Sequence, residues 1–266
     1  MLLKALLLGL MLSAACFAQA VEEVRVGAYH FPPYAIKPES QQVGGLLPEL
    51  LQALNQLQSD YRFTLVATSV MRRYRDMQSG RFDLMFFESP GWGWQGVPHA
   101  PLDLRIEDAE VYVTRQQAGR DESYFDDLKG KRMALYSGYH YGFAGFNSDK
   151  QFLTDNFRAV LTYSHDSNLN MLLRDRADVA VITRSYLRAY QQRYPEQSRA
   201  LLISERVDQY YRHHALLRPR APIQPEQFMA LYEALHDNGA LEKIFSRYQI
   251  RVVPAAADSS TTATTD

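Results

Sequence analysis

A repeated pattern constrains the fold of this chain more than any other feature of its sequence. Asp83 and Asp178 are each followed by four apolar residues, and an apolar residue of a predicted helix, Met77 or Leu172, lies six positions before each aspartate. Continuous apolar runs of this length are typical of strands that are buried on both faces of a parallel sheet. A helix–Asp–strand unit that occurs twice predicts two α/β lobes of the same design.

The stretches that open the two predicted lobes also resemble each other. Residues 24–34 read VRVGAYHFPPY, and residues 124–138 read YFDDLKGKRMALYSG. In both, a basic residue precedes a short apolar strand, and glycine and aromatic residues follow it. The length of 266 residues allows one large domain or two medium ones. Two similar units in one direction favour two lobes.

Composition limits the class of protein. Apolar residues make up 46% of the chain and the formal net charge is −1, which is typical of a globular protein with its own core. There is no basic excess that would indicate nucleic acid, so we expect no nucleic-acid partner. The sequence has no phosphate-binding glycine loop and no nucleophile elbow, and we expect no cofactor.

The first twenty residues have the features of a secretory signal. Lys4 precedes an apolar run, 6–12, that is too short to span a bilayer, and Ala18-Gln19-Ala20 has the A-x-A pattern of a cleavage site. We predict cleavage after this pattern and a periplasmic protein. A lipid anchor at Cys16 is the less favoured alternative, because serine stands where lipoprotein signals favour leucine. Cys16 is the only cysteine, so the mature chain would contain no disulfide.

The order of these parts resembles the extracytoplasmic solute-binding proteins of the family that serves polar amino acid importers. The resemblance covers Val24 to about Ile250 and rests on VGAYHFPPY, GGLLPELLQAL, MQSGRFDLMFF, DLKGKRMALYSG, RADVAVI and ALYEALHDNGALEKIFSRY. It implies a two-lobed α/β fold in which two crossing strands join the lobes. It also implies a divergent, monomeric binding protein without catalytic activity, which captures a small polar solute, amino-acid-like or other, for the membrane subunits of an ABC importer.

The resemblance also sets the expected domain boundaries. The signal occupies 1–20, lobe one contains 24–104 and 211–253, and lobe two contains 105–210. Residues 254–266 have no apolar periodicity, and we expect this tail to be disordered.

The charged clamp of the amino acid binders in this family is missing from the aligned positions. Such members have a Thr-x-x-Arg after the aspartate strand of lobe one, whose arginine holds the ligand carboxylate, and an aspartate after the matching strand of lobe two. Alignment from Asp83 puts Trp92 at the threonine position and Gln95 at the arginine position. Alignment from Asp178 puts Thr183 at the position of the lobe-two aspartate. A neutral glutamine cannot replace a guanidinium at similar strength.

Other side chains near the predicted cleft could form the site. Aromatic rings suit a flat or cationic ligand, although the two tryptophans of the loop 90–96 could equally cap the core. Glu88 ends a buried strand, where sites form. Arg72 and Arg73 lie near the cleft wall by alignment and could contact a ligand, or they could lie on a solvated helix face. Ser137-Gly138 could offer N–H groups to an anion or form a plain turn. The predicted ligand-binding residues are Tyr29, Phe31, Tyr34, Arg72, Glu88, Trp92, Gln95, Ser137, Tyr139 and Thr183.

Two alternative functions remain open at this point. The same fold could report its ligand to a membrane sensor, a role that gene neighbours would distinguish from import. It could also be a periplasmic dehydratase of cyclic acids, with Glu88 and His165-Asp166 as candidate acids and bases. His213 and His214 are adjacent and would point to opposite faces of a strand, so they cannot share an ion, and we expect no metal site.

Since both halves of the clamp are missing, we predict weak or no binding of ordinary α-amino acids. Calorimetric titration of the protein with glutamine and with arginine should give no submicromolar affinity. A submicromolar dissociation constant for either amino acid would contradict this prediction.

Overall fold

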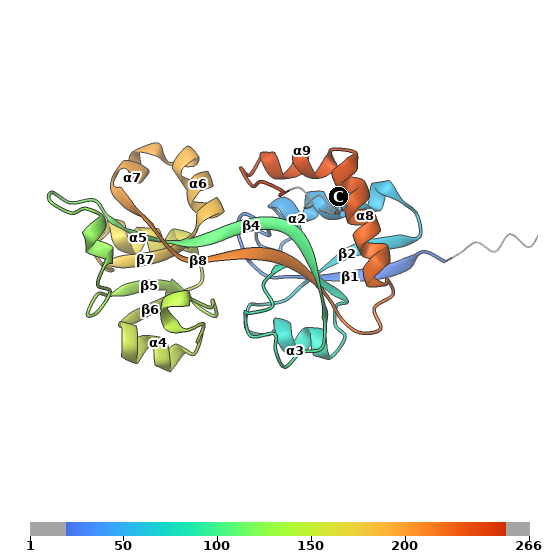
Figure 1. Cartoon of the computed structure of the whole chain (residues 1–266), viewed down its shortest axis with the longest axis horizontal. Coiled ribbons are helices and arrows are strands. Elements are labelled where there is room, and N and C mark those ends of the chain that lie inside the picture. Colours follow the sequence, from blue (N-terminus) through green and yellow to red (C-terminus); the bar gives the residue numbers. More distant parts are fainter. Residues whose placement is uncertain (1–19, 254–266) are drawn as a thin grey trace, which may run out of the picture.

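The computed structural model describes residues 20–253, so the predicted signal with Cys16 and the predicted disordered tail fall outside the described residues. Two α/β lobes are joined by two long strands, β4 (Ala100–Arg115) and β8 (Leu201–Leu217), as Figure 1 shows. The predicted two-lobed fold with two crossing strands is therefore confirmed.

One eight-stranded sheet runs through both lobes in the order β2-β1-β3-β8-β4-β7-β5-β6. Within each lobe three strands are parallel, since β1 pairs with β2 and β3, and β5 pairs with β6 and β7. The long strands β4 and β8 are antiparallel to each other and to these neighbours. The six shorter strands are β1 (Glu22–Ala28), β2 (Tyr61–Ala67), β3 (Leu84–Glu88), β5 (Met133–Tyr136), β6 (Ala159–Thr162) and β7 (Val179–Thr183).

Helices cover the sheet in both lobes. The C-terminal helices return to lobe one and contact the first helix there, as the red and blue ribbons of Figure 1 show. Lobe one contains α2 (Leu46–Leu57), α3 (Arg73–Gln78), α8 (Pro225–Asp237) and α9 (Ala240–Ser246). Lobe two contains α4 (Lys150–Phe157), α5 (His165–Leu173), α6 (Arg184–Arg193), α7 (Pro195–Arg199) and the short turns η1 (Glu122–Phe125) and η2 (Gly142–Ala144).

The crossing strands are longer than their apolar runs indicate. The sequence predicts strands at 109–114 and 211–217, whereas β4 begins at Ala100 and β8 at Leu201. The added residues include many polar side chains, because these segments cross between the lobes and are only partly covered. The predicted lobe boundaries at 104/105 and 210/211 fall inside these two strands and stay a prediction.

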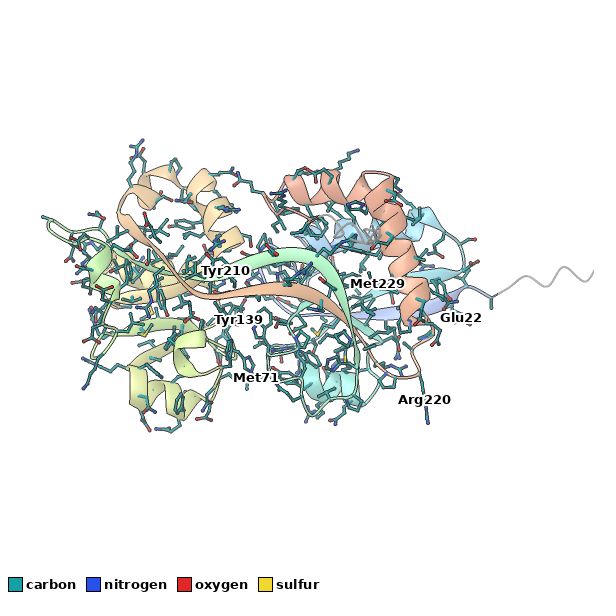
Figure 2. The ribbon with its side chains drawn as sticks, viewed as in Figure 1. Glu22, Met71, Tyr139, Tyr210, Arg220 and Met229 are labelled. Atoms are coloured by element: carbon teal, nitrogen blue, oxygen red, sulfur yellow. The ribbon has the colours of Figure 1, made fainter. Side chains whose placement is uncertain are left out.

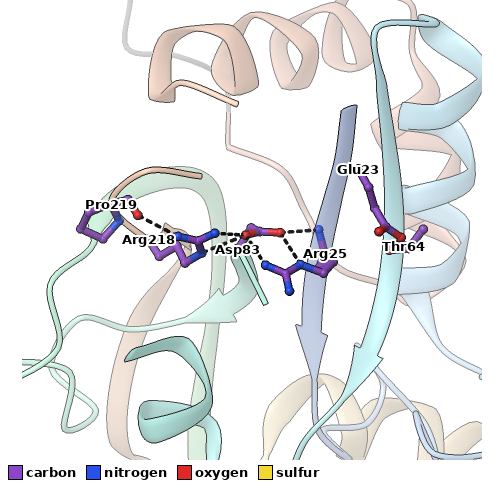
Figure 3. Close-up of polar contacts among 6 residues, drawn as sticks. All are labelled: Glu23, Arg25, Thr64, Asp83, Arg218 and Pro219. Carbon is purple, nitrogen blue, oxygen red and sulfur yellow. Dashed lines mark hydrogen bonds and ion pairs between the residues drawn. The ribbon is translucent and has the colours of Figure 1, made fainter. Parts of the chain in front are cut away.

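Arginine–aspartate pairs fix the central strands at the same place in each lobe. Arg25 donates to Asp83 from its backbone N, Nε and Nη2, each at 2.9 Å, and Arg218 adds Nε and Nη2 at 2.8 and 2.6 Å (Figure 3). Arg132 donates to Asp178 through the same three groups at 2.7–3.1 Å. Each arginine–aspartate contact lies next to the point where two parallel strands begin to pair, β1 with β3 in lobe one and β5 with β7 in lobe two. The repeated aspartates of the sequence therefore set strand register.

We predict that Asp83→Asn destabilises the fold in a pH-dependent way. Burial disfavours ionisation, but the hydrogen bonds from Arg25 and Arg218 outweigh it and hold the pKa of Asp83 below its usual value. A carboxyl with a lowered folded-state pKa stabilises the protein above its unfolded pKa, and the contribution is lost as pH falls through the folded pKa. Urea denaturation at pH 7 should show a loss of about 3 kcal/mol, which shrinks below about pH 4.

Glu23→Gln is the matched control. Exposed Glu23 lies on the same strand as Arg25 and accepts a hydrogen bond from Thr64 Oγ1 at 2.8 Å (Figure 3). Removing this surface charge should change the free energy of unfolding by less than about 0.5 kcal/mol. Equal effects of the two substitutions, or an effect of Asp83→Asn that does not depend on pH, would contradict the prediction.

Candidate functional site

A closed cavity lies where the two lobes meet the crossing strands. It is about 10 Å³, the room that one water molecule needs. Lobe one contributes a set of mostly aromatic walls, lobe two contributes the loop after β5, and the crossing strands contribute two polar side chains. The lining residues are Tyr29, Phe31, Arg73, Trp92, Glu110, Gly138, Tyr139, His140 and Gln209.

Parallel strands of both lobes end at this cavity. Tyr29 and Phe31 follow β1, and Glu88 is the last residue of β3. Tyr139 follows β5, and Thr183 is the last residue of β7. Sites in α/β sheets form beyond the carboxyl ends of strands, so the topology of both lobes leads to the same place.

A buried ion pair stands in the wall of lobe one. Arg73 is 2% exposed, and its Nε lies 3.2 Å from Glu88 Oε1, although the geometry is not that of a hydrogen bond. Trp94 Nε1 donates to Glu88 Oε2 at 2.8 Å, and Arg73 Nη1 donates to the Val70 carbonyl. The guanidinium lies 4.4 Å from the centre of the Tyr74 ring. The cavity is thus lined by a fixed cation whose charge Glu88 balances.

Strand β4 carries two buried acids near the cavity. Asp108 accepts hydrogen bonds from Tyr34 OH at 2.7 Å, the Ala109 N–H at 2.8 Å, the Ser185 N–H at 3.3 Å and the Ser185 hydroxyl. Burial raises the pKa of Asp108 above its usual value, and the hydrogen bonds from these donors offset only part of the rise. Since Tyr34 belongs to lobe one and Ser185 to α6 of lobe two, this carboxyl contacts both lobes.

The second acid, Glu110, lines the cavity itself. Its Oε1 accepts from Thr183 Oγ1 at 2.8 Å and from Tyr211 OH at 3.1 Å, whereas its Oε2 is buried without a hydrogen-bond partner among residues 20–253. His165 Nε2 lies 3.0 Å from Thr183 Oγ1 and acts as the donor, because the threonine proton goes to Glu110. Burial lowers the pKa of His165 to about 3 and raises that of Glu110 well above its usual value.

The lobes are in contact around the cavity. Tyr136 OH of lobe two donates to the His30 carbonyl of lobe one at 3.0 Å, and the rings of Phe31 and Tyr139 meet edge to face with centres 5.7 Å apart. In Figure 2, Tyr139 of lobe two lies beside β8, and Met71 of lobe one lies where the two lobes face each other. The aromatic side chains of the cleft therefore fill most of the space between the lobes.

The structure brings together some of the predicted site residues. Tyr29, Phe31, Trp92 and Tyr139 line the cavity. Glu88 and Thr183 lie directly behind it, in contact with Arg73 and Glu110 respectively. Both readings of the tryptophan loop are realised, since Trp92 lines the cavity and Trp94 is fully buried against Glu88.

Other predicted site residues lie elsewhere. Tyr34 is fully buried and bonded to Asp108, outside the cavity lining. Arg72 and Gln95 are exposed and do not line the cavity. The Ser137 N–H donates to the Thr162 carbonyl at 2.8 Å and is not available to an anion, whereas Gly138 lines the cavity, so ligand binding at this turn stays a prediction.

Sequence reasoning did not single out three of the lining side chains, Glu110, His140 and Gln209, and it named Arg73 only together with Arg72. Arg73 is buried rather than solvated, because neighbouring residues of a helix point about 100° apart and Arg72 takes the outer side. Asp108 and Glu110 alternate along a strand, a signal that they share one face. His140 and Gln209 stand in segments that showed no apolar periodicity.

A closed cavity between two α/β lobes that are joined by two crossing strands is the architecture of a solute-binding protein. The family model described as "ABC transporter, phosphonate, periplasmic substrate-binding protein" matches residues 46–260. The chain belongs to this family of periplasmic substrate-binding proteins of ABC transporters. The predicted assignment to the extracytoplasmic solute-binding proteins is confirmed.

Solved structures support the fold at low sequence identity. An ABC uptake transporter substrate-binding protein from Streptococcus pneumoniae with bound histidine is 16% identical, with a TM-score of 0.69 over 87% of this chain and 94% of that one. An ancestral arginine-binding protein bound to arginine is 19% identical, with a TM-score of 0.66 over 85% and 98%. The ancestral amino acid-binding protein AncCDT-1, a precursor of cyclohexadienyl dehydratase, is 15% identical, with a TM-score of 0.63 over 85% and 94%. The comparison with curated proteins gives no match.

Residues 20–253 offer neither a candidate membrane span nor a candidate metal site. No helix in this range has the length and apolar character needed to cross a membrane. Within the same range, no group of three or more His, Cys, Asp or Glu side chains is placed to hold a metal ion.

We predict that Gly138→Ala prevents the lobes from closing fully. A Cβ on Gly138 would stand 3.0 Å from Val70 Cγ1 and 2.9 Å from Met71 Sδ across the cleft. Val70 is buried and stiff about χ1, so it cannot move away at low cost. With spin labels on cysteines introduced at exposed Gln78 and Thr154, the mean interlobe distance should increase.

Gly119→Ala separates the contact from backbone strain. Gly119 has a φ of 75°, close to the 82° of Gly138, but nothing lies within 4 Å of its Cβ position. Both substitutions should therefore cost stability through strain, and only Gly138→Ala should change the interlobe distance. An unchanged distance in Gly138→Ala would show that the contact does not limit closure.

Proposed function

We propose that this protein captures a compact polar solute that carries both an acidic group and an amine, either amino-acid-like or an aminophosphonate, for an ABC importer. One observation carries the proposal: a buried guanidinium, Arg73, and a carboxyl with a free oxygen, Glu110, line the same closed cavity. They come from lobe one and from a crossing strand, so a solute between them would stabilise the closed arrangement of the lobes.

Arg73 suits the acidic end of such a solute. A guanidinium has several N–H donors, and within the described residues only Nη1 has a partner with hydrogen-bond geometry. The ion pair with Glu88 and the stacked Tyr74 ring hold the group in one orientation. A fixed guanidinium recognises a carboxylate or phosphonate through paired N–H donors, which fits both the family description and the bound amino acids of the similar structures.

Glu110 and the aromatic rings suit the amine end. The free Oε2 can accept a hydrogen bond from an ammonium group, and rings such as Tyr29, Phe31 and Tyr139 offer cation–π contact. Because the closed cavity has room for only about one water molecule, entry of a solute requires the lobes to part and the rings to move. This restriction favours compact solutes.

The same proposal includes a cellular location, an oligomeric state and a partner. We propose a periplasmic monomer, exported by the predicted signal, that binds a small molecule and delivers it to the membrane subunits of an importer. Size-exclusion chromatography with light scattering of the exported protein tests the monomeric state.

The alternatives have less support. The predicted dehydratase residues Glu88 and His165 lie behind the cavity wall, and the Asp166 carboxyl accepts a hydrogen bond from Tyr186. The matching family consists of binding proteins. A sensing role would use the same site, and no observation on this chain favours it over import.

The test is a thermal-shift screen followed by calorimetry on matched variants. A ligand that binds only the folded protein raises the melting temperature by mass action. Compact aminophosphonates and amino acids should give the largest shifts, and both Glu110→Gln and the double variant Arg73→Met/Glu88→Gln should weaken binding at least about tenfold. The double variant is used because Arg73→Met alone would leave Glu88 buried and unpaired.

Arg72→Met and Gln95→Ala are the controls, since both side chains are exposed outside the cavity. They should bind like the wild type. Equal weakening in Arg72→Met and in the Arg73 double variant, or binding restricted to solutes without an acidic group, would contradict the proposed site.

A further inference from the structure

Two buried carboxyls on one strand have no basic partner among residues 20–253. Asp108 and Glu110 are two positions apart on β4, so they lie on the same side of the strand. All of their hydrogen-bond partners are hydroxyls or backbone N–H groups. Two neighbouring carboxylates without a cation repel each other at low dielectric, and such pairs retain a proton.

The hydrogen bonds indicate which carboxyl holds the proton. Both oxygens of Asp108 accept hydrogen bonds, whereas Glu110 receives them on Oε1 alone. A buried anion with one bare oxygen costs more than the neutral acid. The proton therefore belongs on Oε2 of Glu110, the oxygen of the residue that lines the cavity.

The surroundings of Glu110 also favour its neutral form. Asp208 of β8 accepts hydrogen bonds from the N–H groups of Gly142 and Phe143 and from Tyr112 OH, and its negative charge raises the pKa of Glu110. His165 is buried and neutral, and Arg73 across the cavity is already paired with Glu88. The other titratable groups that line the cavity or contact Glu110 are neutral as well, because burial lowers the pKa of His140 to about 4 and raises the pKa of Tyr29, Tyr139, Tyr141 and Tyr211.

We infer that Glu110 carries a proton on Oε2 in the ligand-free protein and loses it to solvent when the amine of the solute binds. The inference rests on the proposed function and adds a regulatory property to that site. The step is balanced: the neutral acid and the ammonium form of the solute give a carboxylate–ammonium pair and one proton in the buffer. Binding of the amine then strengthens as pH rises, for as long as the ligand-free protein holds the proton.

The first experiment needs no ligand. Infrared spectra of the wild type at neutral pH should contain the carbonyl stretch of a protonated carboxyl, and Glu110→Gln should lack it. The matched control is Glu107→Gln, because Glu107 lies on the same strand but is exposed, and it should keep the band. Persistence of the band in Glu110→Gln, or its absence from the wild type, overturns the inference.

Stability gives a second ligand-free measurement with a defined sign. Since the pKa of Glu110 is raised in the folded state, its contribution is fully present below the unfolded value and is lost as pH rises through the folded value. The stability of the wild type relative to Glu110→Gln should therefore fall as pH increases above about 4.5. A constant difference between the two proteins, or one that grows with pH, contradicts the inference.

A third experiment counts the protons released during binding. Calorimetry with 2-aminoethylphosphonate in buffers of different ionisation enthalpy should show one more proton released by the wild type than by Glu110→Gln, and this difference cancels protonation changes of the ligand itself. Ethylphosphonate, which lacks the amine, should show no such difference. The ratio of wild-type to variant affinity for the amine should rise about tenfold per pH unit while Glu110 is protonated.

The outcomes separate the two proposals. Binding of both probes with equal proton counts in wild type and variant overturns proton release and leaves the solute-binding site intact. Failure of both probes to bind the wild type at millimolar concentration counts against the proposed solute class and against proton release together, while the infrared band still decides where the proton is.

Discussion

The structure depends on the arginine–aspartate pairs that join the central strands of each lobe. Asp83 draws Arg25 and Arg218 to the start of β3, and Asp178 draws Arg132 to the start of β7. Side chains at the opposite ends of these strands build the cavity. Register set at Asp178 therefore decides the position of Thr183, because a strand slip of one residue would turn Thr183 to the other face of the sheet. In β3 a bulge between Met85 and Glu88 also contributes to the position of Glu88.

The site uses charge differently from the clamp expected for amino acid binders of the resembling family. Its cation, Arg73, is balanced in place by Glu88, and its acid, Glu110, is surrounded by neutral hydroxyls. Neither group is left as a lone buried charge, which would cost several kcal/mol. This arrangement lets a closed cleft persist with aromatic rings in contact and still offers a donor group and an acceptor group to a solute.

The fold could be read from the sequence because its signals are local and repeated. Apolar runs after Asp83 and Asp178, glycine breaks and helical spacing are properties of short segments. The site depends on details that such signals do not resolve. One step along a helix separates exposed Arg72 from buried Arg73. Glu110 and Gln209 face each other because β8 begins at Leu201, ahead of its apolar run, and pairs there with β4.

Asp108 has a mechanical consequence. Its carboxyl is bonded to Tyr34 of lobe one and to Ser185 of lobe two, yet it belongs to a strand that joins them. A point held by both bodies and by their connector is the natural axis of a rotation, because only motions about that point leave its bonds unstretched. The lobes should therefore rotate relative to each other about β4, with the largest displacement around Met71 and the smallest at Asp108.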